Sequence, residues 1–251
     1  MKKLIIILLV LISFAHSAHC DNKSIIDSAN QAYNKNKYVE AIALYKKVID
    51  NGYEAADIYY NIGNSYFRIA NFPYAILNYE KAKKLNPADA DIDFNLKIAN
   101  TKIIDKLEVV PQLFFVKWWN AFSNLFSIDN WAIASIICIS LFILFLLIYI
   151  VSNSYNIKKI SFWLFIIMLF LSITSYGFAR KQYTHIISQT EGIILTPTVT
   201  VRSSPDEKGT DKFVIHEGTK VVIEDELNNW VKVRIANGSN GWVEKQTYEL
   251  I

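Results

Sequence analysis

The stretch WAIASIICISLFILFLLIYIV, residues 131–151, and the stretch ISFWLFIIMLFLSITSYGF, residues 160–178, contain no Asp, Glu, Lys or Arg. As helices, both are long enough to cross a hydrocarbon core of about 30 Å at about 1.5 Å per residue. A helix packed inside a soluble protein usually keeps a polar stripe along one side, and neither stretch has one. The sequence therefore predicts a two-helix transmembrane hairpin. The alternative is a buried helix pair in a soluble all-α protein.

The first residues, 1–18, have the layout of a secretory signal peptide. A short basic start precedes an apolar run at 4–14, and small residues follow it. An uncleaved signal anchor is the alternative, because the small-residue site at 15–17 matches a cleavage site only weakly. Lipidation of Cys20 is disfavoured, since His19 is larger than the residue that normally precedes a lipidated cysteine.

Export of the segment after the signal peptide determines the expected topology. The first span then runs inward, residues 152–159 form a cytoplasmic loop, and the second span returns outward. We therefore expect a multi-pass protein of the bacterial inner (cytoplasmic) membrane, with both large domains on the periplasmic side. Lys158 and Lys159 fit the positive-inside rule, but Arg180 and Lys181 nearly cancel the bias, so the prediction depends mainly on the signal peptide.

The charge and cysteine content exclude several classes of function. Residues 21–108 contain 12 basic and 12 acidic residues, and residues 188–251 contain 7 basic and 10 acidic ones. No nucleic-acid partner is therefore expected. Cys20 and Cys138 lie in different compartments or depths, so we expect no disulfide framework, no metal site and no cofactor. Because the spans carry no charge, transport is not expected either.

An internal repeat with a step of 34 residues follows the signal peptide. The sequence YVEAIALY at 38–45 returns as FPYAILNY at 72–79. This step is the tetratricopeptide period, and the second copy resembles that family. The residues that match its pattern are Tyr59, Ile62, Gly63, Tyr66, Ala75, Tyr79, Ala82 and Pro87. The resemblance implies an all-α tetratricopeptide superhelix, with repeats at about 23–54 and 55–88 and a capping helix at 89–107.

Proteins of this family bind their ligands on the concave face made by the first helix of each pair. The resemblance implies a peptide-binding groove that contains Asn30, Tyr33, Tyr60, Asn64, Phe67 and Arg68, with Ile26, Phe94 and Ile98 at further groove positions. Asn30 and Asn64 could contact a peptide backbone or could bridge neighbouring helices. Ile26 and Asp91 stand where carboxylate-binding members have basic residues. The expected ligand is therefore a helix or an aromatic-bearing segment.

Aromatic residues dominate the segment 111–127, between the repeats and the first span. Phe114, Trp118, Phe122 and Phe126 are spaced by four and share one face of a helix. Indole rings favour the headgroup region, so we predict an interfacial amphipathic helix. The predicted membrane-interface residues are Trp118, Trp119 and Trp131. Docking of this helix onto the repeats is the alternative, and Ser127 is the predicted N-cap of the first span.

Residues 188–251 alternate between apolar and polar side chains, with turn signals between the runs. The stretches at 199–205, 216–223, 230–235 and 241–243 resemble the bacterial SH3 domain. This resemblance implies an all-β SH3-like barrel of about five strands. The candidate SH3 groove contains Arg202, Trp230 and Trp242, which suit a peptide or a cell-wall stem by aromatic packing and a charge-assisted hydrogen bond. At least one of the two tryptophans is expected to lie in the core instead.

The order of segments resembles the BatE branch of the Bacteroides aerotolerance proteins. The resemblance is carried by the repeat, by the run from DFNL at 93–96 to VVP at 109–111, by Trp118 and Trp119, and by FVIHEG at 213–218. It implies a membrane-bound assembly factor that works beside von Willebrand-type domain proteins, a MoxR-type ATPase and other Bat-type components. The implied process is tolerance of oxygen or envelope stress.

The expected function is therefore a membrane-anchored scaffold or adaptor, whose partners are other proteins and the lipid bilayer. An enzyme is not expected, because the four histidines and two cysteines form no plausible nucleophile and base pair and no G-x-S-x-G or phosphate loop is present. The alternative function is a cell-wall tether, in which the SH3 domain binds peptidoglycan and the repeats are passive.

Overall fold

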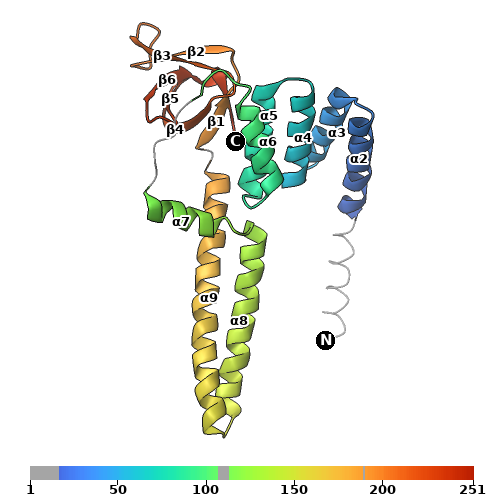
Figure 1. Cartoon of the computed structure of the whole chain (residues 1–251), viewed down its shortest axis with the longest axis vertical. Helices are drawn as coiled ribbons and strands as arrows, with labels where there is room; N and C mark the ends of the chain where they lie inside the picture. Colours follow the sequence, from blue (N-terminus) through green and yellow to red (C-terminus); the bar gives the residue numbers. More distant parts are fainter. Residues whose placement is uncertain (1–16, 107–112, 189) are drawn as a thin grey trace. The chain divides into compact units, whose positions relative to one another are not determined.

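The computed structural model describes residues 17–106, 113–188 and 190–251, and only the backbone of residues 17–21. Its helices α2 to α9 and strands β1 to β7 are drawn in Figure 1. The chain divides into two compact units. The first contains the N-terminal helices and the C-terminal sheet, and the second is built on two long apolar helices. The predicted signal peptide lies outside the described residues, except that Ser17 and Ala18 belong to α2.

The N-terminal region of the first unit is all helical, and its consecutive helices lie side by side (Figure 1). Its helices are α2 (Ser17–Asn34), α3 (Tyr38–Asp50), α4 (Ala56–Arg68), α5 (Phe72–Leu85) and α6 (Ala90–Asn100). The connections between them are short, which favours antiparallel neighbours. The predicted capping helix at 89–107 is shorter than expected, because α6 ends at Asn100 and an irregular segment follows it.

The structure repeats itself with the 34-residue step found in the sequence. Asn36 and Ala70 both have a positive φ, of 60° and 59°, where the first helix of each pair ends. Ala41 and Ala75 are fully buried at equivalent places. Small side chains are needed where two helices cross, since a Cβ on Gly63 would lie 2.7 Å from the ring of Tyr79. The described helices therefore contain two copies of one helix-pair unit.

The C-terminal region forms one antiparallel sheet with the order β3-β2-β6-β5-β4-β1-β7. Its strands are β1 (Glu191–Ile194), β2 (Thr198–Arg202), β3 (Asp211–His216), β4 (Lys220–Leu227), β5 (Trp230–Ile235), β6 (Asn240–Glu244) and β7 (Tyr248–Leu250). Its core is aliphatic and includes Val201, Ile215, Val221, Val231, Val233 and Val243.

The prediction of about five strands was wrong, because the described sheet has seven. Strands β1, β3 and β7 lie outside the four predicted stretches, apart from His216 at the end of β3. Strands β1 and β7 are too short to show alternation. The predicted continuous stretch at 216–223 is divided by a turn at Gly218, whose φ is 87°. Glycine adopts this left-handed conformation without steric cost.

The sheet packs against the end of the helical region within the first unit. Ile193 and Ile251 are buried in one cluster with Ile76, Leu77 and Leu96. The carboxylate of Asp105, in the segment after α6, accepts hydrogen bonds from the backbone N–H of His216 at 2.6 Å and the hydroxyl of Thr219 at 2.7 Å. Its other oxygen lies 2.8 Å from Nδ1 of His216. The last helices of the repeat are therefore covered by the sheet.

The second unit contains α7 (Phe114–Ser123), α8 (Ile128–Val151) and α9 (Tyr155–Ile187). Both α8 and α9 are long and apolar enough to cross a membrane. None of the most apolar window of α8 is buried, and only 22% of that of α9 is buried, unlike the core helices of a soluble protein. Ser127 is the N-cap of α8, as predicted, and accepts a hydrogen bond from the backbone N–H of Asn130.

The hairpin turn is shorter than the predicted loop at 152–159. Helix α8 ends at Val151 and α9 begins at Tyr155, so Lys158 and Lys159 lie in the first turns of α9. Near the opposite end of the pair, the hydroxyls of Ser135 and Ser172 each donate to the backbone carbonyl of the other residue at 3.1 Å. Such reciprocal bonds satisfy polar groups that water would not reach in a bilayer.

Candidate functional site

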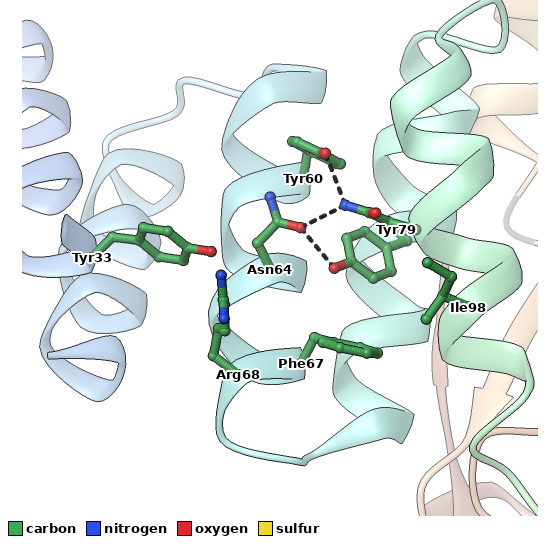
Figure 2. Close-up of a pocket in the computed structure, with 8 residues that line it drawn as sticks. Tyr33, Tyr60, Asn64, Phe67, Arg68, Tyr79 and Ile98 are labelled. Carbon is green, nitrogen blue, oxygen red and sulfur yellow. Dashed lines mark hydrogen bonds between the residues drawn. The ribbon is translucent and has the colours of Figure 1, made fainter. Parts of the chain in front are cut away.

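A pocket of about 350 Å³ opens on the first helices of the repeat and on α6. Figure 2 shows that the side chains of Tyr60, Asn64, Phe67 and Arg68 project from α4, between Tyr33 and Ile98. The structure therefore brings together five of the six predicted groove residues. The complete lining is Tyr33, Tyr60, Asn64, Phe67, Arg68, Tyr79, Asn95 and Ile98.

Asn64 is the centre of a hydrogen-bond network at the floor of this pocket (Figure 2). Its Oδ1 accepts from the hydroxyl of Tyr79 at 2.7 Å and from Nδ2 of Asn95 at 3.0 Å. Nδ2 of Asn95 also donates to the hydroxyl of Tyr60 at 2.8 Å. The bridging role considered for Asn64 is therefore present. Its Nδ2 and the Oδ1 of Asn95 are the amide atoms that this network leaves for a ligand.

Asn30 bridges helices in the same way and does not line the pocket. Its Oδ1 accepts from the hydroxyl of Tyr45 at 2.5 Å, and the equivalent Asn64 and Tyr79 lie 34 residues further along the chain. Burial raises the pKa of the Tyr45 hydroxyl to about 12, with a smaller contribution from Tyr33. Burial also raises the pKa of Tyr79. Both phenols therefore stay protonated and keep donating to the asparagines at neutral pH.

Arg68 supplies the positive charge of the pocket. Its guanidinium group points toward the Tyr33 hydroxyl on α2 (Figure 2), and hydrogen bonding to that hydroxyl raises the pKa of Arg68. Among the described residues, no acidic side chain lines the pocket. Among the side chains that the structure describes, in 22–106, 113–188 and 190–251, no three of His, Cys, Asp or Glu gather in a way that could hold a metal ion. The pocket therefore offers aromatic surface, amide groups and one cation.

Two pocket residues, Tyr79 and Asn95, were not predicted as groove residues. A strict 34-residue step from Tyr60 and Asn64 leads to Phe94 and Ile98, and only Ile98 lines the pocket. Phe94 is 63% exposed outside it. Helix α6 therefore presents Asn95 with Ile98, one turn apart, which departs from exact repetition. Tyr79 could have been found from its spacing, since Asn30 and Asn64 each precede a tyrosine by 15 residues.

The C-terminal sheet has a second pocket, of about 420 Å³. Arg202 and Trp230 line it, and the guanidinium carbon lies 5.9 Å from the ring centre of Trp230. Trp242 pairs with Arg202 across β2 and β6 but does not line this pocket. The expectation that at least one tryptophan is in the core was wrong, because both rings are half-buried and the core is formed by aliphatic residues.

The three predicted membrane-interface residues differ in exposure. Trp118 is 72% exposed and Trp119 is 57% exposed, and their role at a membrane interface stays a prediction. Trp131 is only 7% exposed, because Phe122, Phe126 and Phe178 surround its ring. Trp131 therefore packs inside the protein and is not available to the headgroup layer, which corrects its predicted role.

Comparison with known proteins identifies the C-terminal region. No curated protein shows significant similarity to the chain. Residues 197–248, which cover β2 to β6 and the start of β7, match the family described as the bacterial SH3 domain.

Proposed function

We propose that this chain is a membrane-anchored adaptor that holds a segment of a partner protein in the groove of tetratricopeptide-type repeats. The observation that supports this proposal most directly is the pocket on α2, α4 and α6, where aromatic rings, two asparagines and Arg68 face one opening. Tetratricopeptide repeats take such segments on their concave face. The proposal assigns binding to the chain and no chemical reaction.

The groove chemistry defines the kind of segment. Nδ2 of Asn64 can donate to a peptide carbonyl, and Oδ1 of Asn95 can accept from a peptide N–H. Phe67 and Tyr60 offer flat apolar surface for an aromatic or aliphatic side chain. Arg68 is a single cation, so one acidic side chain or backbone carbonyl is the complementary group. We therefore expect an extended or helical segment with one aromatic residue near one acidic residue.

The α8 and α9 hairpin is the proposed anchor in a bacterial inner membrane. A hairpin returns the chain to the side where it entered, so the repeats and the SH3 domain share one side. The contacts of Asp105 with His216 and Thr219 support this, because two domains on opposite sides could not make them. The signal-like N-terminus favours the periplasmic side.

The resemblance to the BatE branch gives the proposed cellular context. In that context the partners are von Willebrand-type domain proteins or other Bat-type components of an envelope complex, and the process is tolerance of oxygen or envelope stress.

A cell-wall tether is the second candidate function, and the SH3 pocket favours it. Arg202 over the ring of Trp230 offers a cation and a flat apolar surface beside polar groups of Thr198 and Gln246. Such a site suits a short peptide with a carboxylate, as found in peptidoglycan stems. The two functions are compatible, since they use different pockets.

Site-specific photocrosslinking tests the groove. A photoreactive amino acid at Phe67 should crosslink a membrane partner, and the same group at the exposed Phe94 outside the pocket should not. The additional change Arg68→Ala should reduce the Phe67 crosslink about tenfold, as expected for a central interface residue. Lys97→Ala, an exposed cation on α6, is the matched control. Equal crosslinks from both positions, or no effect of Arg68→Ala, would count against the groove.

Peptidoglycan binding separates the second candidate. The double change Arg202→Ala and Trp230→Ala should abolish retention on purified peptidoglycan if the chain is a tether, whereas Arg68→Ala should not affect it. Retention that survives the double change would exclude this pocket.

A further inference from the structure

Helix α7 is fastened to one end of the α8 and α9 hairpin by neutral donors. Gln182, in α9, is only 7% exposed, and its Nε2 donates to the backbone carbonyls of Ser123 at 2.6 Å and Phe126 at 2.9 Å. The indole N–H of Trp131, in α8, donates to the same Ser123 carbonyl at 2.9 Å. Carbonyls at the end of a helix lack partners within that helix. Gln182 and Trp131 therefore satisfy the end of α7 and fix its position.

Aromatic contacts make the same attachment. The ring centre of Trp119 lies 5.0 Å from that of Phe178, and the ring centre of Phe122 lies 5.5 Å from it. The ring centre of Phe122 also lies 6.1 Å from that of Trp131. Figure 1 shows α7 lying across the pair at the end where α8 begins and α9 continues. The helix is therefore held crosswise at one level of the hairpin.

The surface of α7 is divided into three faces. Trp119, Phe122 and Ser123 face the hairpin, as their contacts show. Phe114 and Trp118, one turn apart, form a neighbouring apolar face and are 70% and 72% exposed. Lys117 and Asn120 lie on the remaining side, where Oδ1 of Asn120 accepts from Lys181 at 2.9 Å. An amphipathic helix at a bilayer surface has this division, with apolar rings toward lipid and cations toward water.

The lengths of α8 and α9 agree with a membrane boundary at the level of α7. Helix α8 has 24 residues, or about 36 Å at about 1.5 Å per residue. Helix α9 has 33 residues and is therefore about 14 Å longer than α8. Measured from Tyr155, the first 36 Å of α9 end near Phe178, which is where α7 is attached. The charged residues Arg180 and Lys181 follow directly.

We propose that α7 is a collar seated in the headgroup layer of the bilayer that holds α8 and α9, with Phe114 and Trp118 in contact with lipid. Gln182 is the positioning residue, and the end of α9 beyond Gln182 lies in water. The exposed rings of α7 extend the unburied apolar surface of α8 and α9, so the same lipid would cover both surfaces. The inference rests on the proposed membrane anchoring.

Depth measurements with spin labels on the full chain in lipid nanodiscs test the collar. In a background with Cys20→Ser and Cys138→Ser, single labels are placed by Ile143→Cys, Trp118→Cys and Lys117→Cys. The nanodiscs contain phosphatidylethanolamine and phosphatidylglycerol. We expect the label at 143 to be accessible to oxygen and shielded from a water-soluble nickel chelate. The label at 118 should be shallower but still shielded, and the label at 117 should be open to nickel.

The other outcomes contradict either the collar alone or the membrane anchoring as well. If the labels at 118 and 117 are equally open to nickel while the label at 143 is shielded, the collar is overturned and the anchoring stands. A label at 118 as deep as the label at 143 overturns it as well. If the label at 143 is open to nickel, the membrane anchoring fails, and the collar fails with it.

The role of Gln182 is tested in the same nanodiscs with the label at 118. Gln182→Glu has nearly the same shape, but its carboxylate cannot donate to the two carbonyls. Loss of two buried hydrogen bonds should raise the detached population of α7 roughly tenfold, seen as a mobile spectral component with greater nickel accessibility. Tyr183→Ala, an exposed neighbour on α9, is the control and should change neither signal. Unchanged spectra in Gln182→Glu would overturn the positioning role.

Discussion

The two attachments inside this molecule use opposite chemistry. The sheet is held to the helical region by ionised groups: Asp105 binds His216 and Thr219, Lys220 lies 2.9 Å from Glu80, and Lys81 lies 2.9 Å from Glu249. Helix α7 is held to the hairpin mainly by Gln182 and Trp131, which are neutral donors to backbone carbonyls. Both attachments also bury apolar side chains.

The difference agrees with the proposed membrane anchoring, under which the two attachments would open into different surroundings. In water, an opened carboxylate or ammonium is hydrated, so ionic contacts are reversible and modest in strength. Near hydrocarbon an exposed charge is energetically costly. A hydrogen bond between a neutral donor and a backbone carbonyl satisfies both polar groups and lowers the free-energy cost of placing them there. The residues at each attachment therefore fit water around the first unit and, under the proposed anchoring, lipid beside the second.

The largest effect is expected where a large ring fills the attachment of α7. Trp131→Ala removes a buried side chain and one of the donors to Ser123, so it should weaken this attachment by about 3 kcal/mol. Hydrogen exchange of peptides covering 114–126, in the full chain in nanodiscs, should accelerate roughly a hundredfold. Trp118→Ala removes an equal ring from the exposed face and should change exchange only slightly. Similar acceleration in both variants would contradict the distinct role of Trp131.

A smaller effect is expected at the ionic attachment. Asp105→Ala leaves the N–H of His216 and the hydroxyl of Thr219 without their acceptor, which should cost about 2 kcal/mol. Exchange of peptides covering 213–219 should accelerate roughly thirtyfold, while peptides covering 114–126 should keep their rate. Asp27→Ala, an exposed acid on α2, is the control. If the 213–219 peptides are unaffected, the carboxylate of Asp105 does not contribute to holding the two domains together.

The sequence predicted the helical repeat, the hairpin and the sheet better than it predicted the contacts that join them. The 34-residue step, the uncharged runs at 131–151 and 160–178, and the alternation after residue 188 each record a regular contact pattern that recurs along the chain. The contact between Asp105 and His216 spans 111 residues and has no period, so no local pattern indicates it. The same reason explains why Gln182 was not predicted to reach Ser123 and Phe126.

The pocket on the repeat also contains residues that the 34-residue step predicted and residues that it did not. The repeat step placed Tyr33, Tyr60, Asn64, Phe67 and Arg68 in one pocket, because these positions lie on equivalent faces of first helices. It failed at α6, where Asn95 lines the pocket and Phe94 does not. A terminal helix has no following repeat to fix its rotation, and the sheet packs beside it instead. Trp131 was misplaced because an aromatic residue at a helix end fits either lipid or an internal cluster.

The smallest expected effect is the acid dependence of the ionic attachment. Burial alone would raise the pKa of Asp105, but the hydrogen bonds from His216 and Thr219 outweigh it and lower that pKa below its usual 3.8. A carboxyl whose pKa is lower in the folded state stabilises the attachment above pH 3.8 and loses that contribution as the pH falls through the folded value. The signal is the difference in 213–219 exchange between wild type and Asp105→Asn, because this difference leaves out the other acidic groups of the attachment. This difference should be constant near neutral pH and shrink below pH 3.8. The attachment of α7 has no acidic donor or acceptor among its described contacts, so its exchange, corrected for the intrinsic rate, should stay level over the same range. A difference that persists unchanged into strong acid would show that Asp105 contributes through shape and not through its charge.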